Sequence, residues 1–154
     1  MSAYLDQLDK LYSEYLHDIE RITREHFNLR GAFGRLFGGS AAGPGSDSCN
    51  DRFSDGIRQL IDSMVADCPS ADEAAEVIDY VISPQREQNC SQGARLMMQA
   101  VHGYLLPLVE FLSPEDAKEI HVRYSDLLAV NPPLPVQKQL AEDLGKRANI
   151  PSDN

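Results

Sequence analysis

The chain is poor in positive charge. Its 154 residues contain 14 Lys and Arg against 24 Asp and Glu, so the formal net charge is −10. Binding to nucleic-acid phosphates depends on clustered Lys and Arg, and attraction to an anionic membrane surface depends on the same residues. We therefore expect no nucleic-acid partner and no membrane partner. The simplest role of the excess acid is solubility.

Cysteine is scarce as well. The three thiols, Cys49, Cys68 and Cys90, are widely separated and odd in number, which does not fit a disulfide framework. With His102 they could in principle bind zinc, but they lack the short spacing that is typical of zinc sites. The opening residues MSAYLDQLDK show no basic start followed by an apolar run, so no signal peptide is predicted. These features together indicate a cytoplasmic protein with no metal and no cofactor.

Strand-like alternation of apolar and polar residues is absent from the sequence, which predicts an all-α fold. The most apolar stretch covers residues 94–112, where only Arg95, Gln99, His102 and Glu110 interrupt it. A helix that is apolar all round is enclosed by protein or by lipid, and its charged residues disfavour lipid. We therefore expect the chain to be one domain, a bundle of five or six helices around this buried central helix.

Pro107 should bend the central helix. Proline has no N–H for the carbonyl of Gly103, and its ring crowds that carbonyl. A proline inside a helix costs about 3 kcal/mol, and a glycine at the crowded position relieves part of the clash. We predict a kink at residues 103–107 that brings His102 close to the bend and can form the wall of a pocket.

The other helices are predicted from apolar periodicity and from capping residues. Their ranges are 4–30, 51–66, 70–82, 113–128 and 136–144. Ser70 and Glu73 form a capping box at the start of one of them. A flexible loop rich in Gly and Ser is predicted over residues 38–48, and a frayed tail over residues 148–154.

The first predicted helix has the most regular apolar seam in the chain. Alternating steps of three and four residues join its members, which are Leu5, Leu8, Tyr12, Tyr15, Ile19, Ile22, His26 and Leu29. Residues spaced in this way form one line along a helix that packs lengthwise against a partner. The partner is either the rest of this chain or a second copy. Residues 4–30 are therefore also the predicted site of self-association or of contact with a protein partner.

No pattern typical of catalysis emerges. Glu14 and His17 form the E-x-x-H pair of carboxylate-bridged di-iron bundles, but such bundles need this pair twice. The glycine-rich loop is not followed by the Lys and Ser or Thr of a phosphate-binding loop. A nucleophile pair of Cys90 with His102 or His121 would lack any local signature. We predict no catalytic residue and a non-enzymatic protein.

Three residues remain as candidate ligand contacts. His102 is predicted to lie buried beside the kink, and histidine titrates near neutral pH. Asp51 and Arg52 stand at a predicted helix start, where anions bind. The simpler alternatives are a structural hydrogen bond for His102, helix capping for Asp51 and an ion pair for Arg52.

The leading functional hypothesis is a protein-binding or adaptor module. It rests on the regular seam and on the lack of catalytic motifs. The alternative is a small-ligand-binding protein with a pocket at the Gly103–Pro107 kink. A metalloenzyme comes third.

Three segments of the sequence resemble small helical proteins of anaerobic Firmicutes. They are GPGSDSCNDRF, MMQAVHGYLLPL and LPVQKQL, and the likeness covers much of residues 43–140. The resemblance implies an all-α fold and a bacterial cytosol, and it brings no activity or ligand with it. This chain departs from these relatives at Asn50, where they carry histidine, which puts any chemistry at that position in doubt.

Overall fold

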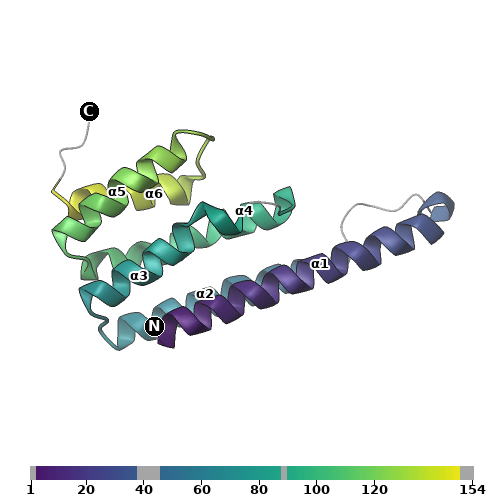
Figure 1. Cartoon of the computed structure of the whole chain (residues 1–154), viewed down its shortest axis with the longest axis horizontal. Helices are drawn as coiled ribbons and strands as arrows, with labels where there is room; N and C mark the ends of the chain where they lie inside the picture. The colour runs from purple at the N-terminus through teal and green to yellow at the C-terminus, as the bar shows by residue number, and fades with distance from the viewer. Residues whose placement is uncertain (1–2, 38–45, 88–89, 150–154) are drawn as a thin grey trace.

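The computed structural model describes residues 3–37, 46–87 and 90–149, and within these ranges it contains helices and connections but no strand. The elements follow one another as α1 Ala3–Phe37, α2 Ser46–Ala66, α3 Ala71–Ile82, η1 Pro84–Arg86, α4 Gln92–Ala100, η2 Val101–Phe111, α5 Pro114–Leu128 and α6 Pro135–Arg147. The two segments η1 and η2 are 3₁₀-helices. The predicted all-α bundle is thus confirmed (Figure 1).

Helices α1 and α2 form a long antiparallel hairpin along one side of the bundle (Figure 1). The side chains of Leu8 and Tyr12 are buried, and the ring centroids of Tyr12 and Phe53 lie 4.9 Å apart, edge to face. The helices approach closely at Gly56, where an added Cβ would lie 2.6 Å from a methyl carbon of Leu11. The first half of the predicted seam therefore packs against its own chain.

Helix α1 continues to Phe37, past its predicted end at residue 30, and includes Gly31 and Gly34. A glycine inside a helix costs about 1 kcal/mol. It ends the helix only where the backbone turns into the left-handed conformation. The helix end predicted at residue 30, before Gly31, is therefore wrong.

The predicted loop over residues 38–48 is only partly described. Residues 38–45 lie outside the described ranges, and residues 46–48 belong to the first turn of α2, which begins earlier than predicted. Of the predicted tail, residues 148–149 form a turn after α6, and residues 150–154 also lie outside the described ranges.

Helix α3 matches its prediction closely. The backbone N–H of Glu73 donates to the Oγ of Ser70 at 3.1 Å, and the backbone N–H of Ser70 donates to the Oε1 of Glu73 at 3.4 Å. This is the predicted capping box. The apolar residues whose periodicity predicts this helix form its buried face, and they are Ala74, Val77, Ile78, Val81 and Ile82.

The central segment is only partly buried, against the prediction of a helix enclosed on all sides, because Leu96 is 46% exposed and Pro107 is exposed as well. Its conformation also changes earlier than the predicted kink. Helix α4 ends at Ala100, and a 3₁₀-helix, η2, replaces the α-helix from Val101 to Phe111. Pro107 lies inside η2, so an unbroken α-helical pattern is impossible across this turn. Segment η2 packs against α2, α3, α4 and α6 and is the centre of the bundle.

Helices α5 and α6 form a second hairpin, which lies on the opposite side of the bundle from α1 (Figure 1). Helix α5 begins at the predicted cap, where the Oγ of Ser113 accepts from the backbone N–H of Asp116 at 3.1 Å. Helix α6 packs along η2, and at Gly103 an added Cβ would lie 3.1 Å from a methyl carbon of Val136. This arrangement brings the end of α3, the end of α5 and the start of α6 around His102.

Candidate functional site

A pocket of about 210 Å³ lies beside His102, and we refer to it as the His102 pocket. Five parts of the chain form it: the end of α3, the residues after it, α4 with the start of η2, the end of α5 with the following connection, and α6. Its lining residues are Ile82, Pro84, Glu87, Gln99, His102, Tyr124, Leu127, Leu128, Val130, Asn131, Pro132 and Gln137. Only the fold brings these residues together, because they are spread over more than fifty positions of the sequence.

A buried polar cluster forms part of this lining. The Nδ1 of His102 lies 2.8 Å from the hydroxyl of Tyr124 and 3.4 Å from the Nε2 of Gln137. All three side chains are buried. Polar groups in such a place are normally fully hydrogen-bonded, because burying an unpaired one costs free energy.

The Nε2 of His102 is the exception, since it is buried and makes no hydrogen bond of good geometry among the described residues, although the backbone of Val81 acts on the imidazole as a hydrogen-bond acceptor. The amide nitrogen of Gln137 can only donate, so Nδ1 accepts and Nε2 carries the proton, which meets the backbone of Val81 only in poor geometry. An unsatisfied buried group of this kind costs about 1–3 kcal/mol. Such a cost in a native structure calls for a reason, and a bound ligand or water is one.

Burial also sets the protonation of the cluster. Desolvation lowers the pKa of His102 to about 4, and the nearby backbone of Val81 offsets only part of that shift. Desolvation raises the pKa of Tyr124 above its ordinary value, against the opposing effect of Gln137. At neutral pH the imidazole and the phenol are therefore both uncharged.

Glu87 is the charged member of the lining. Partial burial raises the pKa of its carboxyl group above the ordinary value, and the amide of Gln99 and the charge of Arg95 oppose this shift. The Nε2 of Gln99 donates to the Oε2 of Glu87 at 3.4 Å, which is a long hydrogen bond. The carboxylate is therefore only weakly compensated where it faces the pocket.

Apolar side chains complete the walls and the rim. Ile82 and Leu128 line the pocket, and so do Leu127, which is 36% exposed, and Val130, which is 77% exposed. A single exposed apolar side chain is common. Several of them gathered in one place are unusual, and such a patch often marks a surface that another molecule covers. The pocket thus combines a small number of polar groups with an apolar rim, as ligand sites generally do.

The structure separates the three candidate residues. His102 lines the pocket, whereas Asp51 and Arg52 are exposed on α2 and do not line it. Arg52 forms an ion pair with Asp18, with 3.5 Å between the Nη1 of Arg52 and the carboxylate. Of the predicted kink residues 103–107, none lines the His102 pocket, and Leu106 lines a second, separate groove.

The sequence pattern missed Glu87, Tyr124 and Gln137. Tyr124 appears there only as one apolar position on a helix face, and Glu87 and Gln137 stand in no motif. Their partners lie many residues away, so no local signal could have identified them. Only His102 had such a signal, as a lone polar residue in an apolar stretch next to a proline.

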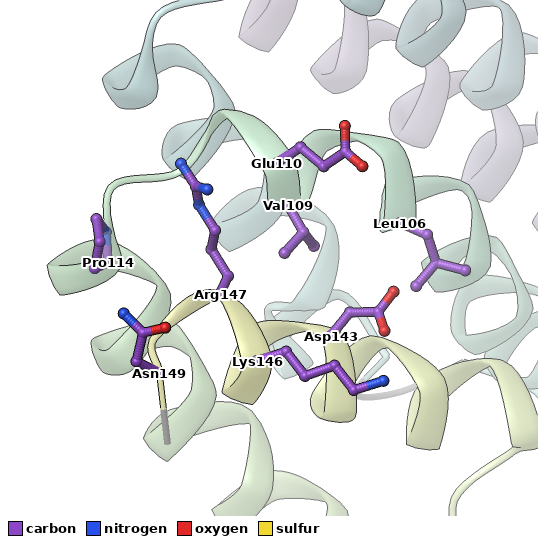
Figure 2. Close-up of a pocket in the computed structure, with 8 residues that line it drawn as sticks. All are labelled: Leu106, Val109, Glu110, Pro114, Asp143, Lys146, Arg147 and Asn149. Carbon is purple, nitrogen blue, oxygen red and sulfur yellow. The ribbon is translucent and has the colours of Figure 1, made fainter. Parts of the chain in front are cut away.

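A second groove of about 490 Å³ lies between η2 and the end of α6 (Figure 2). Figure 2 shows its lining, which is Leu106, Val109, Glu110, Pro114, Asp143, Lys146, Arg147 and Asn149. The Nε of Arg147 donates to the backbone carbonyl of Leu112 at 2.8 Å, and the ammonium of Lys146 lies 3.8 Å from an exposed carboxylate of Glu142. The groove is larger than the His102 pocket, but its charged groups are already paired or exposed to water.

The described residues contain no group of three His, Cys, Asp or Glu side chains that could hold a metal ion. Glu14 and His17 are both exposed on α1. No helix in the described part of the chain has both the length and the apolar character needed to cross a membrane. Comparisons with protein-family models, with curated proteins and with solved structures found no match.

Proposed function

We propose that this protein is a non-enzymatic binding protein that holds a small molecule in the His102 pocket. The poorly hydrogen-bonded Nε2 of buried His102, in a polar cluster that lines a cavity, carries the proposal. A buried polar atom that is left unpaired costs about 1–3 kcal/mol of stability, and one in a poorly aligned hydrogen bond costs part of that. A ligand that fills this cavity and reorganises the hydrogen bonds of the cluster would recover part of that energy.

The lining favours binding over catalysis. Among its described side chains there is no Ser, Cys or Lys that could act as a nucleophile. A histidine whose pKa is about 4 is a weak base at neutral pH, and general bases work best when their pKa is near the working pH. These side chains are better suited to hold a ligand than to transform it.

The size of the cavity limits the ligand. Sites for drug-sized molecules have volumes of about 300–1,000 Å³, and the His102 pocket, at about 210 Å³, is smaller. We expect a compact ligand, about the size of one ring with a short substituent.

A blocking variant tests the proposal. Leu127 stands at the rim and is partly exposed, so Leu127→Trp should fill the mouth of the pocket without burying a strained side chain. Val122→Trp is the matched control, because Val122 lies on the same helix, is 52% exposed and does not line the pocket. We expect ligand-detected NMR with a mixture of single-ring compounds to find binders to wild type and to Val122→Trp.

The same compounds should bind Leu127→Trp at least about tenfold more weakly, which corresponds to about 1.4 kcal/mol. Equal binding to both variants would place the ligand elsewhere on the molecule. A wild-type protein that binds no compound in the mixture would contradict the proposal as a whole.

Self-association through α1 is a second candidate function, and one observation favours it. Helix α1 is much longer than α2, and its far end extends past the rest of the bundle (Figure 1). Ile22 continues the apolar seam beyond the core residues Leu8 and Tyr12 and is half-buried rather than buried. Light scattering over a concentration series would reveal a dimer, and a monomer at every concentration would exclude this candidate.

A further inference from the structure

We infer that the His102 pocket takes a small organic cation, an ammonium group on an apolar body, with Glu87 as its counter-ion. This inference rests on the proposed function, because it names the chemical class of the ligand for the same pocket. It is carried by the charges of the lining, by the surroundings of Glu87 and by the position of the apolar residues.

The lining is negatively charged. Glu87 is its one carboxylate, and no Lys or Arg occurs among the described residues that line the pocket. His102 is uncharged at neutral pH, so it does not balance the carboxylate. An anionic ligand would therefore enter a site that repels it, and a cationic one would meet an opposite charge.

Glu87 lacks a close cationic partner. No ion pair within 4.0 Å involves its carboxylate among the described residues, and its hydrogen bond from Gln99 is long, at 3.4 Å. Arg95 acts on it only as a more distant charge. A half-buried carboxylate without a partner is costly, and an ammonium group in the pocket would supply the missing partner at hydrogen-bonding distance.

The rest of the lining suits the apolar body of such a ligand. Leu127, Leu128 and Val130 stand together on the end of α5 and the connection that follows it. Tyr124 adds an aromatic side chain, and ammonium groups are attracted to aromatic faces. A bare metal ion fits less well, because the described residues provide no cluster of three ligating side chains.

Three probes of similar size separate the effect of charge from that of shape. They are phenethylammonium, phenethyl alcohol and phenylacetate, which carry a positive charge, no charge and a negative charge on closely similar apolar bodies. Affinity for wild type, measured by isothermal titration calorimetry, should fall in that order. We expect the ammonium compound to bind about tenfold more tightly than the alcohol, as for a partly buried ion pair.

The variant Glu87→Gln should remove this preference. We expect its affinity for phenethylammonium to fall about tenfold, to the level of the alcohol, while its affinity for the alcohol stays as in wild type. Glu110→Gln is the matched control, because Glu110 lines the other groove (Figure 2) and its loss should leave the preference intact. Melting curves of both variants would verify that they are folded.

The outcomes distinguish the two claims. If wild type binds the three probes equally and Leu127→Trp weakens all of them, the pocket binds small molecules but the inferred charge preference is wrong. The same conclusion follows if Glu87→Gln keeps a tenfold preference for the ammonium compound. If no probe and no other single-ring compound binds wild type, the proposed function itself fails.

Discussion

At the scale of single residues, His102 combines three properties that rarely occur together. Its side chain is 2% exposed, one of its ring nitrogens makes no hydrogen bond of good geometry, and it lines a cavity. Its other nitrogen is held by Tyr124 and Gln137. The ring is therefore fixed in orientation while part of its hydrogen-bonding capacity remains unused, which is how a preorganised binding group differs from a purely structural one.

The pKa of His102 makes stability depend on pH. The pKa is about 4 in the folded protein and about 6.5 in a free chain, so the unfolded state binds more protons between these two values. Stability contributed by the neutral imidazole is fully present above about pH 6.5 and is lost as the pH falls toward 4. We expect a loss of about 3 kcal/mol in the free energy of unfolding, measured by urea denaturation.

His102→Gln provides the control for this prediction. Glutamine keeps a polar side chain beside Tyr124 but does not titrate, so the variant should lose less stability than wild type over the same pH range. The difference between the two curves removes the contribution of the carboxyl groups that also titrate there. Parallel curves for the two proteins would show that His102 is not buried as a neutral group.

The sequence predicted the burial of His102 and its position near a helix disruption, but not its partners. Tyr124 and Gln137 are 22 and 35 positions away, and the pattern around each of them indicates only which face of its own helix is apolar. Periodicity does not say which other helix that face meets. The same limit explains why Asp51 and Arg52 were candidates, since a helix start attracts anions in any sequence.

At the scale of elements, the unusual feature is η2. It is an 11-residue 3₁₀-helix at the centre of the bundle, whereas runs longer than three or four residues are uncommon. Proline explains why an α-helix cannot continue through this segment. Proline alone does not explain why the 3₁₀-helix already begins at Val101, six residues earlier. The close approach of α6 to Gly103 is a second feature that restricts the backbone in this turn.

Two glycines should respond in opposite directions to the same substitution. In Gly103→Ala the new Cβ would lie 3.1–3.2 Å from side-chain atoms of Val136, a stiff β-branched residue, so we expect a loss of about 1–3 kcal/mol from overpacking. In Gly93→Ala the new Cβ meets nothing within 4 Å, and α4 should gain about 0.4–1 kcal/mol. Urea denaturation of both variants measures these changes, and a Gly103→Ala protein as stable as Gly93→Ala would contradict the close packing of η2 against α6.

Element type was easier to predict than element ends. The capping box and the apolar stripe of α3 depend on residues within one helix, and both are confirmed. The end of α1 and the conformation of η2 depend on what the neighbouring segments allow. Proline at 107 does disturb the helix, whereas the end predicted at Gly31 was wrong, because a glycine lowers helix propensity without forcing a stop.

At the scale of the whole molecule, the bundle consists of two helical hairpins on either side of a central segment (Figure 1). The His102 pocket forms where the second hairpin closes over the end of α3. Because the net charge of the chain is −10, the electrostatic potential around the molecule attracts cations and repels anions. The local charge of the pocket and the charge of the chain therefore act in the same direction.

The central claim is that a small molecule enters the pocket beside His102, and an NMR titration of wild-type protein with phenethylammonium tests it most directly. We predict saturable shifts that are largest for the ring of His102 and for the amides of the pocket lining. The chemical shifts of residues that line the groove between η2 and α6 should change much less. A ring of His102 that stays unchanged while the probe binds elsewhere, or does not bind, would contradict the account.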